Sequence, residues 1–353
     1  MKILYLSGGG EGDFGGYGAL KLSVALCSYN GEKFLRPQLR SIAEQTCTPD
    51  EVVVRDDGSS DQSVKILQEF SAQVPFPVRV FVNEENLGST RNFERAIADC
   101  RGEVIALCDQ DDVWTAQKLA RLMEAFDADS RLDVVFTDAE IADGEMRLLG
   151  SRLWDSVGFT RAERRSFNGG DAFKVLIRHN VVTGATMAFR SRMRTRALPI
   201  PPFWVHDGWI ALLAAVTGRI AMFPEPMIRY RRHTAQQIGA GGNPFRKRLE
   251  IALSMDASYF TRSAQRYREA LERVLATEEG NVDDRIRKGF AEKIAHLECR
   301  AALPASRPAR IPPALRELVS LGYHRYDEHG MVGFLQDLIR SSPDTLPPPS
   351  LRK

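Results

Sequence analysis

The sequence has few cysteines, and none lies in a pair of the kind that holds a metal. Five of its 353 residues are cysteines, an odd number without a CxxC spacing. This usage argues against a disulfide framework and against a zinc ribbon, and it fits a reducing compartment best. The N-terminus also lacks the continuous apolar core and the small-residue cleavage site of a secretory signal. We therefore expect the protein in the cytoplasm.

The sequence also lacks a long hydrophobic run and an excess of one charge. Its most apolar later stretch, residues 210–223, is interrupted by Thr217, Gly218 and Arg219 and is too short to cross a bilayer as a helix. The 48 Lys and Arg nearly cancel the 46 Asp and Glu, which leaves a formal net charge of +2. Such a balance provides no general attraction to nucleic acid, so we expect no nucleic-acid partner.

Between residues 22 and 141 the sequence alternates short apolar runs with amphipathic helical patterns. The runs predict strands at 22–28, 51–57, 78–83, 103–109 and 133–141. Strands that are apolar throughout and separated by helices indicate an α/β fold, with a mostly parallel sheet covered by helices on both faces. Further along, the sequence predicts a strand at 183–190 and two short strands within 219–233.

Composition divides the chain into four parts. We predict a flexible leader at 1–20, a sheet-forming domain at 21–242, a helical C-terminal region at 243–341 with a proline-rich break at 304–313, and a disordered tail at 342–353. Basic and apolar residues recur together between Phe245 and Arg310, including Phe260 and Leu271. This basic amphipathic surface could contact the inner face of an anionic membrane. Alternatively, it packs on the rest of the protein with its charges solvated, and both alternatives stay open.

Polar side chains follow four successive predicted strands. They are Cys27, Tyr29 and Asn30 after the first strand, Asp57 after the second, Asn86 and Gly88 after the third, and Asp109 and Asp111 after the fourth. Ligands of parallel sheets bind beyond the carboxyl ends of the strands. Carboxylates spaced like Asp109 and Asp111 suit Mg²⁺ or Mn²⁺ together with phosphate oxygens. The alternative is an acidic turn that caps the next helix.

The order of these motifs is more specific than any one of them. The series LSVALCSYNGEKFLRPQLRSIAEQTCTPDEVVVRDDGSSDQS, followed by NEENLGSTRNFERAIADCRGEVIALCDQDDVW, resembles family-2 glycosyltransferases of the GT-A fold. It is especially similar to rhamnosyltransferase-like bacterial enzymes that build surface polysaccharides, over about residues 22–240. The resemblance implies that a sugar moves, with inversion, from a UDP- or dTDP-linked donor to a hydroxyl of a saccharide or lipid-linked acceptor.

The resemblance also implies roles for individual residues. Residues 21–141 would bind the nucleotide and 142–242 the acceptor. The nucleotide would contact Cys27, Tyr29, Asn30, Asp57, Asn86, Gly88, Arg91 and Asp109, although the spacing after Arg91 departs from the family pattern. Asp109 and Asp111 would form the motif that binds the metal and the diphosphate. Asp207, preceded by His206, would be the catalytic base that opens a helix.

Basic and aromatic residues in the second half leave further alternatives open. Alternation along a strand puts Arg229, Arg231 and His233 on one face. The two arginines would bind the diphosphate and His233 the metal, or the segment is a solvated edge strand. Trp114 and Trp209 each follow an acidic site, so each either contacts a sugar together with His206 or belongs to the core.

Two other functions compete with sugar transfer. A sugar nucleotidyltransferase would share the α/β scaffold, and the glycine-rich segment at 8–16 is similar to its phosphate loop, without the usual basic residue. That enzyme would release pyrophosphate, whereas the glycosyltransferase would release a nucleoside diphosphate. A non-catalytic scaffold that binds nucleotide is the third hypothesis, and it would not need Asp109, Asp111 and Asp207.

Overall fold

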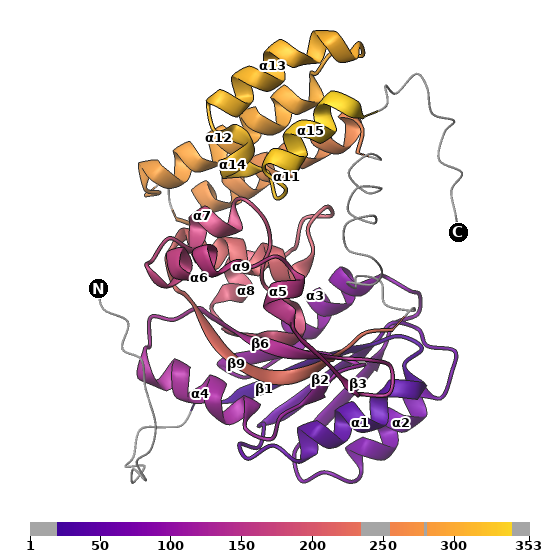
Figure 1. The fold of residues 1–353 in the computed structure, drawn as a ribbon. Coiled ribbons are helices and arrows are strands. Elements are labelled where there is room, and N and C mark those ends of the chain that lie inside the picture. Colours follow the sequence, from indigo (N-terminus) through magenta and orange to yellow (C-terminus); the bar gives the residue numbers. More distant parts are fainter. Residues whose placement is uncertain (1–19, 234–254, 279–280, 341–353) are drawn as a thin grey trace.

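The protein is described by a computed structural model that covers residues 20–233, 255–278 and 281–340. The predicted leader, apart from Leu20, and the predicted tail at 342–353 lie outside these residues. In the described part, one nine-stranded sheet is covered by helices on both faces, and a further group of helices follows it (Figure 1). The predicted α/β class with a C-terminal helical region is confirmed.

Four parallel strands form one half of the sheet, in the order β3-β2-β1-β4. They are β1 (Leu22–Ser28), β2 (Glu51–Asp56), β3 (Val78–Val82) and β4 (Val104–Asp109). Every residue of β1 is buried, because helices cover both faces of the sheet, and the strand is therefore mainly apolar rather than alternating. The four carboxyl ends meet at one edge, as predicted.

The helices that connect these strands cover opposite faces. α1 (Glu32–Ala43), α2 (Ser63–Ser71) and α4 (Lys118–Ala128) share one hydrophobic cluster, whereas α3 (Ser89–Asp99) belongs to the other (Figure 1). Each presents a stripe of apolar residues at three- and four-residue spacing. In α4 the stripe of Leu119, Leu122 and Phe126 is buried against the sheet.

The second half of the sheet is mixed. β8 (Met187–Arg190) lies between β4 and β6 (Val134–Ala142) and is antiparallel to both. β9 (Ile220–Arg231) runs parallel to β6 on its other side. The short β5 (Val113–Trp114) pairs with β9, and β7 (Leu148–Arg152) pairs with β6. Both short pairings are antiparallel.

Two predicted strands differ from the structure. The strand predicted at 183–190 begins only at Met187, because Gly184–Thr186 form a 3₁₀ turn. The two strands predicted within 219–233 are one, β9, whose register with β6 shifts between Phe223 and Pro226. The shift accommodates the prolines at 224 and 226, which have no N–H to donate to the ladder.

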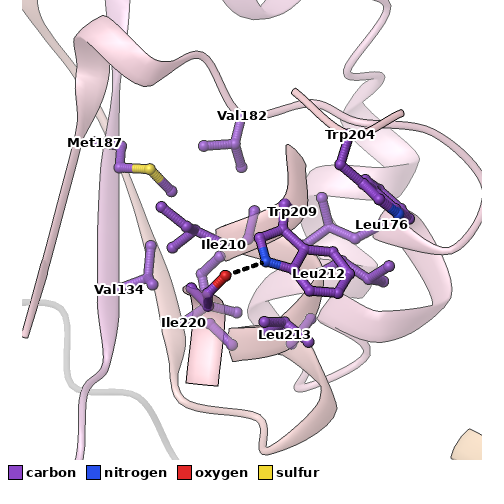
Figure 2. Close-up of a cluster of buried hydrophobic side chains, with 14 of the residues drawn as sticks. Val134, Leu176, Val182, Met187, Trp204, Trp209, Ile210, Leu212, Leu213 and Ile220 are labelled. Atoms are coloured by element: carbon purple, nitrogen blue, oxygen red, sulfur yellow. Dashed lines mark hydrogen bonds between the residues drawn. The ribbon is translucent and has the colours of Figure 1, made fainter. Parts of the chain in front are cut away.

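Short helices cover the face of this half that carries α3. They are α5 (Leu153–Ser156), α6 (Arg161–Asn168), α7 (Ala172–Leu176), α8 (Met193–Ala197) and α9 (His206–Val216). α9 is buried on almost every side, which explains its continuous apolar sequence. At its centre Trp209 is fully buried, and its indole N–H donates a 2.8 Å hydrogen bond to the carbonyl of Ala197 (Figure 2).

The C-terminal helices stand on this layer, at the end of the molecule away from the sheet (Figure 1). They are α11 (Ala257–Thr277), α12 (Asp284–Ala301), α13 (Arg307–Val319), α14 (Gly322–Tyr326) and α15 (Met331–Ile339). The prediction of a proline-rich break at 304–313 is wrong beyond residue 306. Pro308 lies in the first turn of α13, where a missing N–H leaves no partner unsatisfied.

Aromatic contacts join the C-terminal helices to the sheet-bearing part. Tyr267 of α11 packs edge-on against Trp204 with ring centroids 5.4 Å apart, and Phe290 of α12 lies 5.3 Å from Phe173. Phe260 is buried, so it cannot belong to a surface that faces a membrane. Phe260, Tyr267 and Phe290 therefore pack as the helical-cap alternative has it, whereas the part of the predicted surface at 245–254 lies outside the described residues. None of the described helices combines the length and apolar character that crossing a bilayer requires.

Glu163 joins α6 to the segment that leads into the cleft described below. Its carboxylate accepts hydrogen bonds from the backbone N–H and the hydroxyl of Thr160. The first of these forms a capping box together with the bond from the Glu163 N–H to the Thr160 hydroxyl oxygen. It also lies 3.1 Å from Arg178 and 3.0 Å from the ring of His179. Burial alone would raise the pKa of Glu163, but the bonds from His179 and Thr160 outweigh it and lower the pKa to about 2.

We predict that Glu163→Gln destabilises the protein at neutral pH and that the effect disappears in acid. The folded pKa is below the ordinary value of 4.5, so the carboxylate stabilises above pH 4.5, and this contribution is lost as the pH falls towards 2. Urea unfolding at pH 7 should give a loss of about 1–2 kcal/mol, and at pH 3 a smaller one. A difference between wild type and variant that does not depend on pH would contradict this account.

We predict that Trp209→Phe lowers the free energy of unfolding by about 1–3 kcal/mol, because it removes buried volume and leaves the Ala197 carbonyl without its donor. Leu149→Ala is the control, since Leu149 is 49% exposed and should stay within about 0.5 kcal/mol of wild type. Chemical denaturation measures both. Equal effects would show that Trp209 does not stabilise the core in this way.

Candidate functional site

A cleft of about 570 Å³ opens at the carboxyl ends of the parallel strands. Its walls come from the ends of β1, β2, β4 and β9, the start of α3 and the first turn of α9. Nine of the predicted site residues line it, namely Cys27, Tyr29, Asp57, Asn86, Asp109, Asp111, His206, Asp207 and His233. Asn30, Gly88, Arg91, Trp114, Trp209, Arg229 and Arg231 are not part of its lining.

Three carboxylates from distant parts of the sequence converge in the cleft. Asp109 ends β4, Asp111 follows in the next turn, and Asp207 lies in the first turn of α9. Burial, and then the negative charges of Asp111 and Asp207, raise the pKa of Asp109 to about 7. Burial is the largest cause of this shift, and the further contributions of Asp111 and Asp207 reflect their proximity to Asp109.

Gln110 fixes the acidic segment to the end of β1. Its side-chain oxygen accepts a 2.8 Å hydrogen bond from the N–H of Tyr29, and its amide group donates to the Tyr29 carbonyl. A Cβ at Gly31 would lie only 2.2 Å from that side-chain oxygen, so this contact requires glycine. The middle residue of the acidic motif is thus a structural one that sequence reasoning did not single out.

Asp111 and His233 meet at the mouth of the cleft. The Nε2 atom of His233 lies 2.8 Å from an oxygen of Asp111, and its ring stacks on Phe34 with centroids 4.5 Å apart. Within the described part of the chain no group of three or more His, Cys, Asp or Glu side chains forms a complete metal site. Mg²⁺ and Mn²⁺ do not need one, since one or two protein ligands with phosphate oxygens suffice. Asp111 and His233 fit such a site, beside the surplus negative charge at Asp109.

The predicted roles of Arg229 and Arg231 are not supported by where the structure places them. Arg229 is exposed outside the cleft, and Arg231 is buried, with its Nε 2.6 Å from the Asp111 carbonyl and its N–H bonded to Asp112. β9 ends at Arg231, so strand alternation does not continue to His233. The residues that line the cleft here are Tyr230, Arg232 and His233, and the sequence analysis missed the first two.

Asp57 lines the cleft and also holds the turn before α3. Its two oxygens accept hydrogen bonds of 2.9 Å from the N–H groups of Leu87 and Gly88, and one of 2.8 Å from the side chain of Asn83. Gly88 has a φ of +81°, which an L side chain rarely adopts. Its contribution is therefore the shape of the turn that carries Asn86, not a contact of its own.

Asn30 and Arg91, which were predicted to contact the nucleotide, are not part of the cleft lining. The side-chain oxygen of Asn30 accepts a 2.9 Å hydrogen bond from the N–H of Ser60 and so links the ends of β1 and β2. Arg91 pairs with Glu94 at 2.8 Å and donates to the Ile200 carbonyl. Both residues therefore link elements that border the cleft.

Asp207 is held by two groups from the segment before β8. The side chain of Asn180 lies 3.2 Å from one carboxylate oxygen, and the N–H of Gly184 donates to the other at 3.0 Å. Asp207 is not a simple helix cap, because α9 already begins at His206. Sequence reasoning missed Asn180, which lies far from any motif and becomes visible only once the segment folds beside α9.

His206 forms the inner wall of the cleft. Its ring stacks on Phe93 with centroids 4.1 Å apart, and burial lowers the pKa of the imidazole, so it is neutral at pH 7. Neither ring nitrogen has a hydrogen-bond partner among the described residues. A Cβ at Gly184 would lie 2.7 Å from Nε2, so this glycine leaves room for the ring.

A buried lysine lies beneath the acids. The ammonium of Lys118 donates a 2.6 Å hydrogen bond to the Ala185 carbonyl and sits 3.6 Å above the centre of the Trp114 ring. Burial lowers its pKa to about 7, against the attraction of Cys108, Asp112 and Asp109. The available signal was a lysine beside the apolar stripe of α4, and the sequence analysis did not use it.

The structure corrects the prediction that two tryptophans contact a sugar. Trp114 is 4% exposed and Trp209 is fully buried, and both belong to hydrophobic clusters. Because both side chains are buried, the core alternative is the correct one for each.

Comparison with known proteins agrees with this geometry. Residues 23–192 match the family described as "Glycosyl transferase family 2". "Uncharacterized protein Rv1520" of Mycobacterium tuberculosis is 30% identical over 214 residues, which are 60% of this chain and 59% of that protein. "Uncharacterized glycosyltransferase alr2836" of Nostoc sp. is 28% identical over 228 residues, or 61% and 66% of the two chains. The chain thus matches less than two thirds of these relatives' length.

A solved structure shares the fold. Residues 1–349 of S. aureus TarS, in a complex with UDP-GlcNAc, superpose with a TM-score of 0.51 and 17% identity, over 90% of this chain and 89% of that one. The mixed sheet, the acidic cleft at its edge and the match over residues 23–192 agree with one another. Residues 23–192 thus match glycosyltransferase family 2, and the fold of the sheet-bearing part agrees with that match.

Proposed function

We propose that the protein transfers a sugar, with inversion, from a nucleoside-diphosphate sugar to a hydroxyl group of a saccharide or lipid-linked acceptor. A UDP- or dTDP-linked donor and a step in bacterial surface-polysaccharide synthesis are the finer parts of the proposal. The observation that carries it is the convergence of Asp109, Asp111 and Asp207 in one cleft. Such a cleft has room for a diphosphate at one end and a nucleophile at the other.

The nucleotide belongs on the side of the cleft formed by β1 and β2. Cys27, Tyr29, Asp57 and Asn86 line that side, which is the carboxyl edge where parallel sheets bind nucleotides. The hydrogen bonds that Asp57 accepts from the turn before α3 keep this wall in place without a ligand. Tyr29 is 42% exposed and so offers a ring face to the base or sugar.

We assign Mg²⁺ or Mn²⁺ to Asp111 and His233, next to Asp109. Bound there, the cation would neutralise charge that develops on the departing diphosphate. Arg232 lines the same end of the cleft, and its guanidinium suits phosphate oxygens. The raised pKa of Asp109 supports the assignment, because burial and the charges of Asp111 and Asp207 disfavour its carboxylate form and a cation would favour it.

Asp207 is the catalytic base of the proposal. The acceptor hydroxyl gives its proton to Asp207 as its oxygen bonds to the anomeric carbon. The bond from that carbon to the diphosphate breaks on the opposite face, and a nucleoside diphosphate leaves. The bonds from Asn180 and Gly184 hold the carboxylate in one orientation, which such a proton transfer requires.

The proposal also places the protein in the cytoplasm, at the inner face of the membrane if the acceptor is lipid-linked. Release of a nucleoside diphosphate distinguishes this reaction from that of a nucleotidyltransferase, which would release pyrophosphate. The glycine-rich segment that suggested the latter lies outside the described residues.

We predict that Asp207→Asn and Asp111→Ala abolish nucleoside-diphosphate release in a donor screen with Mg²⁺ or Mn²⁺. Loss of the base should lower kcat roughly 100- to 10,000-fold while donor binding by calorimetry is retained. Asp111→Ala should weaken metal-dependent donor binding as well. Asp155→Asn, at an exposed carboxylate, is the control. Full turnover in either variant would overturn its assigned role, and pyrophosphate as product would favour the nucleotidyltransferase.

We predict that Arg232→Ala weakens donor affinity about 10- to 100-fold, because a charged hydrogen-bond donor to the diphosphate is lost. Arg229→Ala is the matched control, since Arg229 lies three residues away on the same segment and outside the cleft. It should bind donor like wild type. If Arg229→Ala had the larger effect, our placement of the diphosphate would be wrong.

A further inference from the structure

The C-terminal helices expose an unusual number of large apolar side chains. Among the described residues, eight of the 15 exposed large hydrophobic side chains lie between positions 311 and 339. On α13 they follow a helical spacing of four, with Ile311 46%, Leu315 44% and Val319 82% exposed. A stripe of this kind on a soluble helix normally faces a partner.

α15 buries the polar residues Gln336 and Asp337 beside Phe334 and leaves other large apolar side chains exposed. Met331, Leu335 and Ile339, again four residues apart, are 45%, 53% and 48% exposed. The opposite side of the helix buries Asp337 and Arg340. Burying charged groups while leaving leucine in water is unfavourable unless the outer face is itself covered.

A buried ionic network explains why α15 tolerates this orientation. Asp337 accepts hydrogen bonds from Arg300 at 2.6 Å and from the hydroxyl of Tyr323 at 2.7 Å. Arg310 of α13 donates to the carbonyls of Asp337 and Arg340. Since the start of α13 meets the end of α15, the two helices are neighbours that run in opposite directions.

The charges beside these stripes are mainly positive. Within residues 307–339 the exposed arginines are Arg307, Arg316 and Arg325, whereas the one exposed carboxylate is that of Glu328. Arg325 lies 3.9 Å from Glu292, so Arg307 and Arg316 of α13 are the principal cations. An apolar stripe flanked by arginine is the pattern of helices that lie in the headgroup region of a bilayer.

A second copy of the chain would fit this surface less well. In a symmetric dimer the same patch meets itself, so the arginines of α13 would face those of the partner copy. An anionic lipid surface instead attracts each basic residue near it. Figure 1 places α13 and α15 in the group of helices at the end of the molecule away from the sheet, and the two helices are in contact.

We propose that the outward stripes of α13 and α15 form a docking surface for an anionic membrane. The surface comprises Ile311, Leu315, Val319, Met331, Leu335 and Ile339, flanked by Arg307 and Arg316. It deepens the proposed peripheral location and does not depend on the sugar chemistry. It also replaces the surface around Phe260 that the sequence suggested.

The test is flotation of the full chain with vesicles of phosphatidylglycerol and phosphatidylcholine in equal parts, compared with phosphatidylcholine alone. We expect binding to the anionic vesicles that weakens at high salt. The double variant Leu315→Asp with Leu335→Asp should lower the bound fraction at least about tenfold. Its matched control is Leu148→Asp with Leu149→Asp on β7, where both side chains are 49% exposed, and binding should not change.

A second pair of substitutions separates membrane docking from misfolding and from dimer formation. This pair is the double variant Arg307→Gln with Arg316→Gln, which leaves the apolar stripes intact. It should weaken binding to the anionic vesicles only. This variant tests the proposal even if the aspartate variant misfolds. No binding to anionic vesicles at low salt would overturn the proposal, as would an equal loss in the β7 control. A concentration-dependent dimer that the stripe substitutions dissociate, without vesicle binding, would show that a second copy covers the surface. Because flotation needs no donor, its failure is distinguishable from failure of the proposed transfer reaction.

Discussion

The crowding of negative charge at one edge of the sheet is the constraint on which the rest of the cleft depends. Burial, and then repulsion by Asp111 and Asp207, raise the pKa of Asp109 to about 7. A folded chain tolerates this only if other interactions hold the acids in place. The arrangement of the acids therefore favours binding of a cation and of a hydroxyl group, and it exists before any ligand binds.

Several polar residues provide that support, of which Lys118 is fully buried. Gln110 links the acidic segment to β1, and Asn180 orients Asp207. Lys118 of α4 donates to the Ala185 carbonyl in the 3₁₀ turn. None of these side chains needs to touch a substrate. They make the geometry rigid because each buried polar group has a specific partner, and losing that partner is costly. Glu163 contacts the side chains of Arg178 and His179, and so it holds the segment that leads to Asn180.

The basic face of the cleft and the outer helices illustrate where a pattern in the sequence misleads. Alternation predicted Arg229 and Arg231 at the site, but β9 ends at Arg231 and Arg232 lines the cleft instead. Basic and apolar residues around Phe260 suggested a membrane surface, yet that ring is buried against its neighbours. In α15 the pattern is reversed, because Arg300 attracts Asp337 to the inside.

The sequence by itself determined the α/β alternation, the four parallel strands and the acids that follow them, because period and strand-end polarity are local properties of the chain. It also indicated Asp207 at the start of a helix. Only the tertiary structure decided which side chains share the cleft: that Trp114 and Trp209 lie beneath it, that Arg91 turns to Ile200, and that Asn180 reaches Asp207. These outcomes depend on where elements end and on what packs across from them, and neither is written within a few residues of the side chain concerned.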